Sequence, residues 1–116
     1  MTLDGRTVLI LEDELIIAFA LEDMLVDMGA SVRSASTVAE GLEQVEGGAL
    51  SFAILDVNVQ GEKSYPVAEA LQARDVPLIF ATGYGDAEHP PHFAAAPTLT
   101  KPYNRQQLIQ AIERLL

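Results

Sequence analysis

The sequence contains no cysteine, which excludes disulfides, thiolate metal sites and cysteine nucleophiles. Basic side chains are also scarce, since 7 Lys and Arg stand against 17 Asp and Glu, a formal net charge of −10. This charge repels phosphate backbones and removes the attraction behind most non-specific nucleic-acid binding. No apolar run approaches the roughly 20 residues of a membrane span, and residues 1–6 are no signal peptide. We therefore expect a cytoplasmic protein that binds neither nucleic acid nor membrane.

The remaining composition is that of an ordinary globular protein. About half of the 116 residues are apolar (49%) and about a fifth are charged (21%), with no low-complexity tract. This length is close to the usual size of one domain with a single hydrophobic core. We expect one domain over residues 1–116, without an output domain, acting as a monomer.

Strand-like and helix-like patterns alternate along the chain. Short aliphatic runs without polar alternation predict buried strands, and apolar residues at three- and four-residue steps predict helices between them. Thr37 and Glu40 fit a capping box, while Ser64 and Asn104 are candidate helix caps. The expected strands are 7–11, 30–34, 52–56, 77–82 and 97–100; the expected helices are 17–28, 37–46, 64–74 and one after Asn104. This βα alternation predicts a parallel sheet between helices, because parallel strands require crossover connections.

The segment 83–97 interrupts this alternation. Its glycines and prolines remove amide donors and add backbone freedom where a crossover helix is expected, so we expect mostly loop or a short, distorted helix. His89 and His92 have a spacing that a metal pair could use, but no third ligand is near them in sequence. We expect both histidines to be surface loop residues.

Polar residues of different kinds end four of the apolar runs. Glu12 and Asp13 follow the first run, Asp56 ends the third, Thr82 ends the fourth, and Lys101 follows the fifth. Taken singly, each has an ordinary use as a cap, a turn residue or a solvated side chain. Taken together they are hard to explain by chance, because the carboxyl ends of parallel strands share one edge, where ligands bind.

The combination predicts phosphoryl transfer. Crowded carboxylates oppose one another's ionisation, and a bound Mg²⁺ ion would neutralise their charge. Mg²⁺ suits such a site because it needs only a few carboxylate ligands and keeps several water ligands. Asp56 can then act as a nucleophile that forms an aspartyl phosphate. The cation and Lys101 would neutralise the phosphoryl oxygens, and the Thr82 hydroxyl would donate to one of them.

Four motifs closely resemble the receiver domain of bacterial response regulators (the CheY-like superfamily): VLILEDE, FAILDV, FATGYG and TKPY. The resemblance covers essentially the whole chain and implies a flavodoxin-like (βα)5 fold with strand order 2-1-3-4-5. It implies that Asp56 accepts a phosphoryl group from the phosphohistidine of a sensor histidine kinase, with Lys101 pairing with that group and Thr82 hydrogen-bonding it in the active state. Mg²⁺ would be bound by Asp13 directly, by Glu12 through water, by Asp56, and by Asn58 through its backbone carbonyl. The Lys101–Pro102 bond is often cis in this family.

The chain departs from the family pattern at one position. Thr98 stands three residues before Lys101, where the family usually carries an aromatic switch residue, so the usual coupling of the threonine to a rotating aromatic ring cannot operate there. FATGYG and the helix-poor segment resemble a subgroup of single-domain receivers named for the FATG (FAT GUY) motif. By position alone, Tyr84 is a candidate to take over part of the work of the aromatic residue or to modulate hydrolysis of the acyl phosphate.

Two further function classes remain open at this stage. An aspartyl-phosphate hydrolase on a related scaffold usually needs a second Asp two residues after the first, and Asn58 at that position cannot act as an acid or base. We therefore expect a phospho-acceptor with slow self-dephosphorylation and not a true enzyme. The other class is a receiver-like binding module that is never phosphorylated, against which the complete set of groups argues. A single-domain regulator can bind an effector, relay phosphoryl to a histidine phosphotransfer protein or drain it from a kinase, and the sequence does not choose among these outputs.

Overall fold

The computed structural model describes residues 2–83 and 90–116, so Tyr84, Gly85 and His89 lie outside the described residues. In chain order the elements are β1 (Thr7–Leu11), α1 (Leu15–Asp27), β2 (Ser31–Ala35), α2 (Val38–Glu46), β3 (Phe52–Asp56), β4 (Asn58–Val59), β5 (Glu62–Lys63), α3 (Tyr65–Ala73), β6 (Leu78–Thr82), the 3-10 helix η1 (Pro91–Phe93), β7 (Thr98–Thr100) and α4 (Arg105–Leu115).

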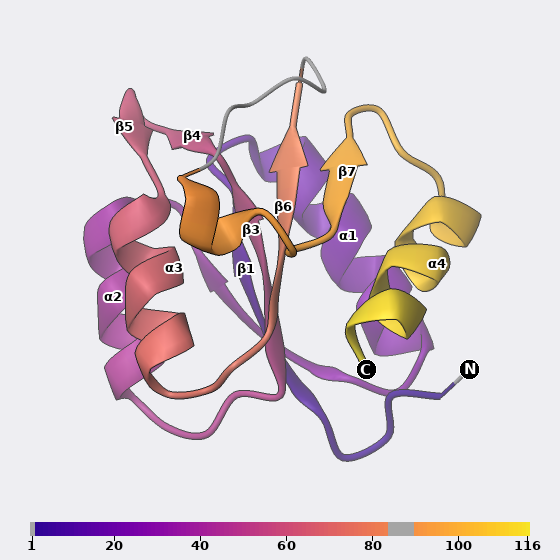
Figure 1. Cartoon of the computed structure of the whole chain (residues 1–116). Helices are drawn as coiled ribbons and strands as arrows, with labels where there is room; N and C mark the ends of the chain where they lie inside the picture. The colour runs from indigo at the N-terminus through magenta and orange to yellow at the C-terminus, as the bar shows by residue number, and fades with distance from the viewer. Residues whose placement is uncertain (1, 84–89) are drawn as a thin grey trace.

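Five parallel strands form the central sheet in the order β2-β1-β3-β6-β7. This confirms the expected order 2-1-3-4-5, counted over the strands of that sheet. Helices α1 and α4 cover one face, and α2 and α3 cover the other (Figure 1). Alternate residues of β1 point into the two layers, Val8 and Ile10 into the first and Leu9 and Leu11 into the second. The unbroken apolar runs of the sequence are thus explained by burial on both faces.

Most expected boundaries agree with the structure to within one or two residues, and two expected caps differ in detail. Thr37 caps α2 by accepting from the Glu40 amide, but the Glu40 carboxylate accepts mainly from the amide and hydroxyl of Ser36, one residue earlier than in a standard capping box. Ser64 occupies the N-cap position of α3, yet its side chain makes no cap hydrogen bond and is fully buried. Asn104 and Gln107 form a complete capping box at α4.

The connection between β6 and β7 contains, in its described part, only the three-residue helix η1. This agrees with the expectation of a short or distorted fourth helix. Phe93 of η1 is buried against Tyr65 and Phe80, with ring centroids 6.0 and 5.6 Å away respectively. The Phe93 ring therefore packs this segment against the core, and a hydrogen bond of 3.2 Å from the Gln72 side chain to the His92 carbonyl adds a second attachment.

All five strands of the sheet run toward one edge, at the top of Figure 1, and the N and C ends of the chain lie at the opposite edge. Within the described ranges, no helix has the combined length and hydropathy needed to cross a bilayer.

Candidate functional site

The topology brings the predicted strand-end residues to adjacent positions. Strands β1, β3, β6 and β7 are consecutive neighbours in the sheet, and Glu12, Asp56, Thr82 and Lys101 lie at or directly after their carboxyl ends. One carboxylate oxygen from each of Glu12, Asp13 and Asp56 lies within 4.8 Å of the others. Residues separated by as many as 89 positions thus share one site.

Lys101 is the centre of the site's hydrogen bonding. Its Nζ lies 2.5 Å from Oε1 of Glu12 and 3.1 Å from Oδ2 of Asp56. Its backbone amide donates to the carbonyl of Thr82 at 2.8 Å, which ties the end of β7 to the end of β6. The peptide bond that follows, to Pro102, is cis. The ammonium therefore joins a carboxylate that follows β1 to the carboxylate at the end of β3.

Burial and charge act on this ion-pair network in opposite directions. Burial raises the pKa of Glu12, as does the nearby Asp56 charge, although hydrogen bonds from Lys101 and from the Glu14 amide partly oppose this rise. Burial alone would lower the pKa of Lys101, but its hydrogen bonds to Glu12 and Asp56 outweigh that effect and raise it. Lys101 consequently remains a cation and acts as an internal counter-ion for the acidic cluster.

Asp13 is held from a different part of the chain. Its Oδ2 accepts a hydrogen bond of 2.9 Å from the backbone amide of Gln60, in the turn between β4 and β5. The Oε2 atom of Glu12 accepts from the Glu14 amide at 3.1 Å. Each acidic residue of the cluster therefore has an identified donor that fixes its orientation.

The donor set fits a divalent cation with a preference for oxygen. The three clustered carboxylates are hard ligands on rigid strand ends, and a Mg²⁺ ion needs only a few such ligands because it keeps several waters. Asn58 begins β4, two residues after Asp56, where its backbone is held by antiparallel pairing with Lys63. Its carbonyl is therefore on a fixed segment beside the cluster.

The remaining predicted residues occupy separate places. Thr82 is buried at the end of β6, at the edge of the sheet where the acidic cluster lies. Thr98 is exposed at the start of the edge strand β7, in register with Phe80. Tyr84 lies outside the described residues, so its expected role stays a prediction. His92 is exposed in η1 and belongs to no cluster of potential metal ligands within residues 2–83 and 90–116.

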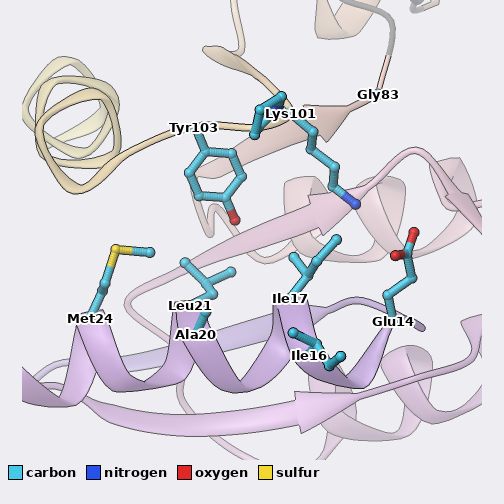
Figure 2. Close-up of a pocket in the computed structure, with 10 residues that line it drawn as sticks. Glu14, Ile16, Ile17, Ala20, Leu21, Met24, Gly83, Lys101 and Tyr103 are labelled. Carbon is cyan, nitrogen blue, oxygen red and sulfur yellow. The ribbon is translucent and has the colours of Figure 1, made fainter.

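Sequence reasoning missed an apolar surface beside the site. A cavity of about 480 Å³ lies between α1 and the β7–α4 connection, with Lys101 at its border. Figure 2 shows Ile17, Leu21 and Met24 of α1 facing Tyr103 across this cavity. Leu15, Ile16 and Phe19 on the same helix are 62%, 85% and 61% exposed. The signal was present in the sequence, because these apolar residues fall outside the buried stripe of α1.

The chain matches the family described as "Response regulator receiver domain" over residues 8–113. It is 29% identical over 117 aligned positions to the response regulator protein TodT of Pseudomonas putida, covering 97% of this chain and 52% of TodT. The chain thus spans about half the length of the curated relatives it matches.

Among solved structures, the solution structure of SdrG from Sphingomonas melonis Fr1 is similar with a TM-score of 0.81 and 42% identity, covering 99% of this chain and 98% of SdrG. The BeF3-activated conformation of SdrG from Pseudomonas melonis Fr1 has a TM-score of 0.80 and 43% identity, with 99% of both chains covered. The receiver domain of PhyR from Erythrobacter litoralis has a TM-score of 0.81 and 26% identity, covering 97% of this chain and 90% of that one.

Proposed function

Because this chain belongs to the response regulator receiver domain family, we propose that it is a phosphorylation-dependent switch of two-component signalling, in which Asp56 accepts a phosphoryl group from the phosphohistidine of a sensor kinase. One observation carries the proposal: the Lys101 ammonium bridges Glu12 and Asp56 at the sheet edge, with Asp13 beside them. This closeness of the Asp56 carboxylate, the Lys101 ammonium and two further carboxylates supports the proposed roles of nucleophile, counter-charge and metal ligands.

In the proposed reaction a carboxylate oxygen of Asp56 attacks the phosphorus of the phosphohistidine. The new O–P bond forms as the N–P bond breaks, and the imidazole nitrogen leaves with the electron pair of that bond. Lys101 already contacts Asp56, so its ammonium would pair with a phosphoryl oxygen once the group is attached. The Thr82 hydroxyl, at the next strand end, would donate to another oxygen.

The carboxylates would also hold the metal. Asp13 and Asp56 would bind Mg²⁺ directly, Glu12 through water, and Asn58 through its backbone carbonyl. When bound, the cation would neutralise negative charge on the transferred phosphoryl group. The pairing of Glu12 with Lys101 supports the indirect role of Glu12, because one of its oxygens is already engaged by the ammonium.

We propose a phospho-acceptor and not a hydrolase, since Asn58 occupies the position at which related hydrolases carry a general acid. An amide side chain cannot donate or accept the catalytic proton, so self-dephosphorylation should be slow.

The exposed part of α1 is the surface that we assign to the phosphoryl donor. Leu15 and Phe19 line a hollow that also contains Glu12, so this apolar surface is continuous with the site. A histidine carried on a partner protein can reach Asp56 only if the partner covers this edge. A kinase domain or a histidine phosphotransfer protein would bury these side chains while transferring phosphoryl.

The test is phosphorylation of wild type, Asp56→Asn and the control Asp27→Asn by acetyl phosphate with Mg²⁺, followed by intact mass and amide spectra. We expect one added phosphoryl group and shifted amides in wild type and in Asp27→Asn, whose side chain is exposed at the far end of α1. Asp56→Asn should show neither. An unmodified wild type would contradict the proposal, and rapid multiple-turnover release of phosphate would favour the hydrolase.

A further inference from the structure

The turn that follows the proposed acceptor is an unusual piece of backbone. β4 and β5 are each two residues long and pair antiparallel, Asn58 with Lys63 and Val59 with Glu62. The two residues between them both have positive φ, 53° at Gln60 and 79° at Gly61. Positive φ at both central positions is the geometry of a type I′ hairpin turn, which matches the twist of the paired strands. For Gln60, whose side chain disfavours this region, the conformation costs free energy.

Both ends of this hairpin are fixed to the core. Val57 and Val59 are buried, and the Val57 amide donates to the carbonyl of Ala81 at 3.1 Å. The Ser64 amide, directly after the hairpin, donates to the carbonyl of Val57 at 2.9 Å. The tip therefore has a defined place relative to the sheet edge and is not a loosely attached loop.

The tip makes its long-range contact with Asp13. The Gln60 amide donates to Oδ2 of Asp13 at 2.9 Å, across 47 residues of sequence. A carboxylate has two oxygens, so this bond orients the group and leaves Oδ1 able to bind a cation. The same hairpin begins with Asn58, whose carbonyl is a proposed metal ligand.

We propose that the Gln60–Gly61 turn is a positioning element of the Mg²⁺ site, which acts through the Gln60 backbone amide on Asp13. This inference rests on the proposed function and deepens it. Groups that orient metal ligands by hydrogen bonding commonly change metal affinity by about 10- to 100-fold when they are lost. Here the orienting group belongs to the main chain, so the residue that controls it is the glycine that permits the turn.

The chain offers a matched pair of variants for the test. Gly61 and Gly5 have φ of +79° and +80°, and a Cβ atom added at either would meet nothing within 4 Å. Valine at either position therefore imposes similar backbone strain without a clash, but only Gly61→Val displaces the Gln60 amide. Gly5 lies before β1, outside the site. Mg²⁺ affinity of each full-length variant is measured by calorimetry, together with amide exchange and amide shifts of the metal-free protein.

We expect Gly61→Val to bind Mg²⁺ on the order of tenfold more weakly than wild type, with Gly5→Val close to wild type and a loss of thermal stability of similar size in both. In metal-free Asp13→Ala, the Gln60 amide should exchange faster while the Val57 amide stays protected. If Gly61→Val does not fold, Gly61→Ala replaces it, because alanine also disfavours positive φ but by less than valine. Gly61→Ala should likewise bind Mg²⁺ more weakly than wild type.

Two results would overturn the inference. One is an unchanged Mg²⁺ affinity in Gly61→Val or Gly61→Ala although the Gln60 amide shift has moved. The other is an exchange rate of the Gln60 amide that is the same in Asp13→Ala as in wild type. The hydrogen bond to Asp13 would then not hold this amide, and any effect of Gly61 on Mg²⁺ binding would have to act through Asn58. Failure of the proposed function is distinguishable from both, since wild type would then gain no stable phosphoryl group from acetyl phosphate, whatever the Mg²⁺ affinities of the glycine variants.

Discussion

Replacement of Lys101 by methionine would remove the ammonium that joins Glu12 to Asp56 while keeping most of the length and apolar stem of the side chain. In the metal-free protein this leaves clustered carboxylates without their internal counter-ion. Two unit charges about 3 Å apart interact by roughly 5 kcal/mol at an effective dielectric constant of about 20. Desolvation of the ammonium offsets part of this, and removal of one partner of a buried pair typically costs about 3–5 kcal/mol.

Because Lys101 keeps 14% of its side-chain surface exposed, we expect the lower end of that range. A loss of about 3 kcal/mol corresponds to a fall in Tm of roughly 10–15 °C for a domain of this size. Mg²⁺ should restore more stability to the variant than to wild type, since the cation no longer competes with the ammonium. A ligand at a hundred times its Kd adds about 2.7 kcal/mol.

The variant should also respond to pH in a defined direction. In wild type, burial raises the pKa of Glu12 above 4.5 and Lys101 opposes that rise, so removal of Lys101 raises the pKa further. A carboxyl with a raised pKa binds more protons in the folded than in the unfolded state. Metal-free Lys101→Met should therefore regain stability as pH falls from 7 toward 4.5, and lose it again as pH rises.

Thermal unfolding with and without Mg²⁺ tests this reasoning, with Arg105→Met as the control. Arg105 pairs with Asp27 at 2.7 Å, but both side chains are largely exposed, and such pairs contribute about 1 kcal/mol or less. The reasoning is refuted if Lys101→Met loses no more stability than Arg105→Met, or if Mg²⁺ stabilises wild type and Lys101→Met equally.

Three other predictions concern the partner surface, η1 and the connection to α4. Ile16→Asp should slow phosphotransfer from the cognate kinase at least about tenfold yet leave labelling by acetyl phosphate unchanged, because Ile16 is 85% exposed on α1; equal loss in both assays would contradict this. Phe93→Ala should cost about 3–5 kcal/mol in chemical denaturation, against about 0.5 kcal/mol or less for the exposed His92→Ala. Burial raises the pKa of Tyr103 to about 12, so stability should fall as pH rises from about 10 toward 12, and Tyr103→Phe should reduce that slope in pH-dependent unfolding.

The residues at the strand ends could be predicted to lie together because the carboxyl ends of all strands in a parallel sheet lie along the same edge. Once Asp56 and Thr82 are placed at the ends of buried strands, the fold leaves few places where they can lie except beside one another. The small helical content of the described part of the β6–β7 connection could also be predicted, from prolines and glycines that a helix does not accommodate.

The β4–β5 hairpin could not be predicted by these means. Strands of two residues have no apolar period to detect, and Gln60 does not favour positive φ, although Gly61 permits it. The contact of Gln60 with Asp13 is made by a backbone amide, which every residue except proline carries. Side-chain identity therefore does not reveal this contact. In the same way, the serine at position 64 does not reveal that its side chain makes no cap hydrogen bond.

The placement of the two chain ends has a practical consequence for biochemistry with this protein. Both ends lie at the sheet edge opposite to the carboxyl ends of the strands, where the acidic cluster lies (Figure 1). A biotin tag or a fluorescent fusion attached to either end would point away from an incoming kinase. The protein can thus be immobilised on a sensor chip with the proposed acceptor edge accessible, and a panel of kinases can be tested for phosphotransfer on one surface.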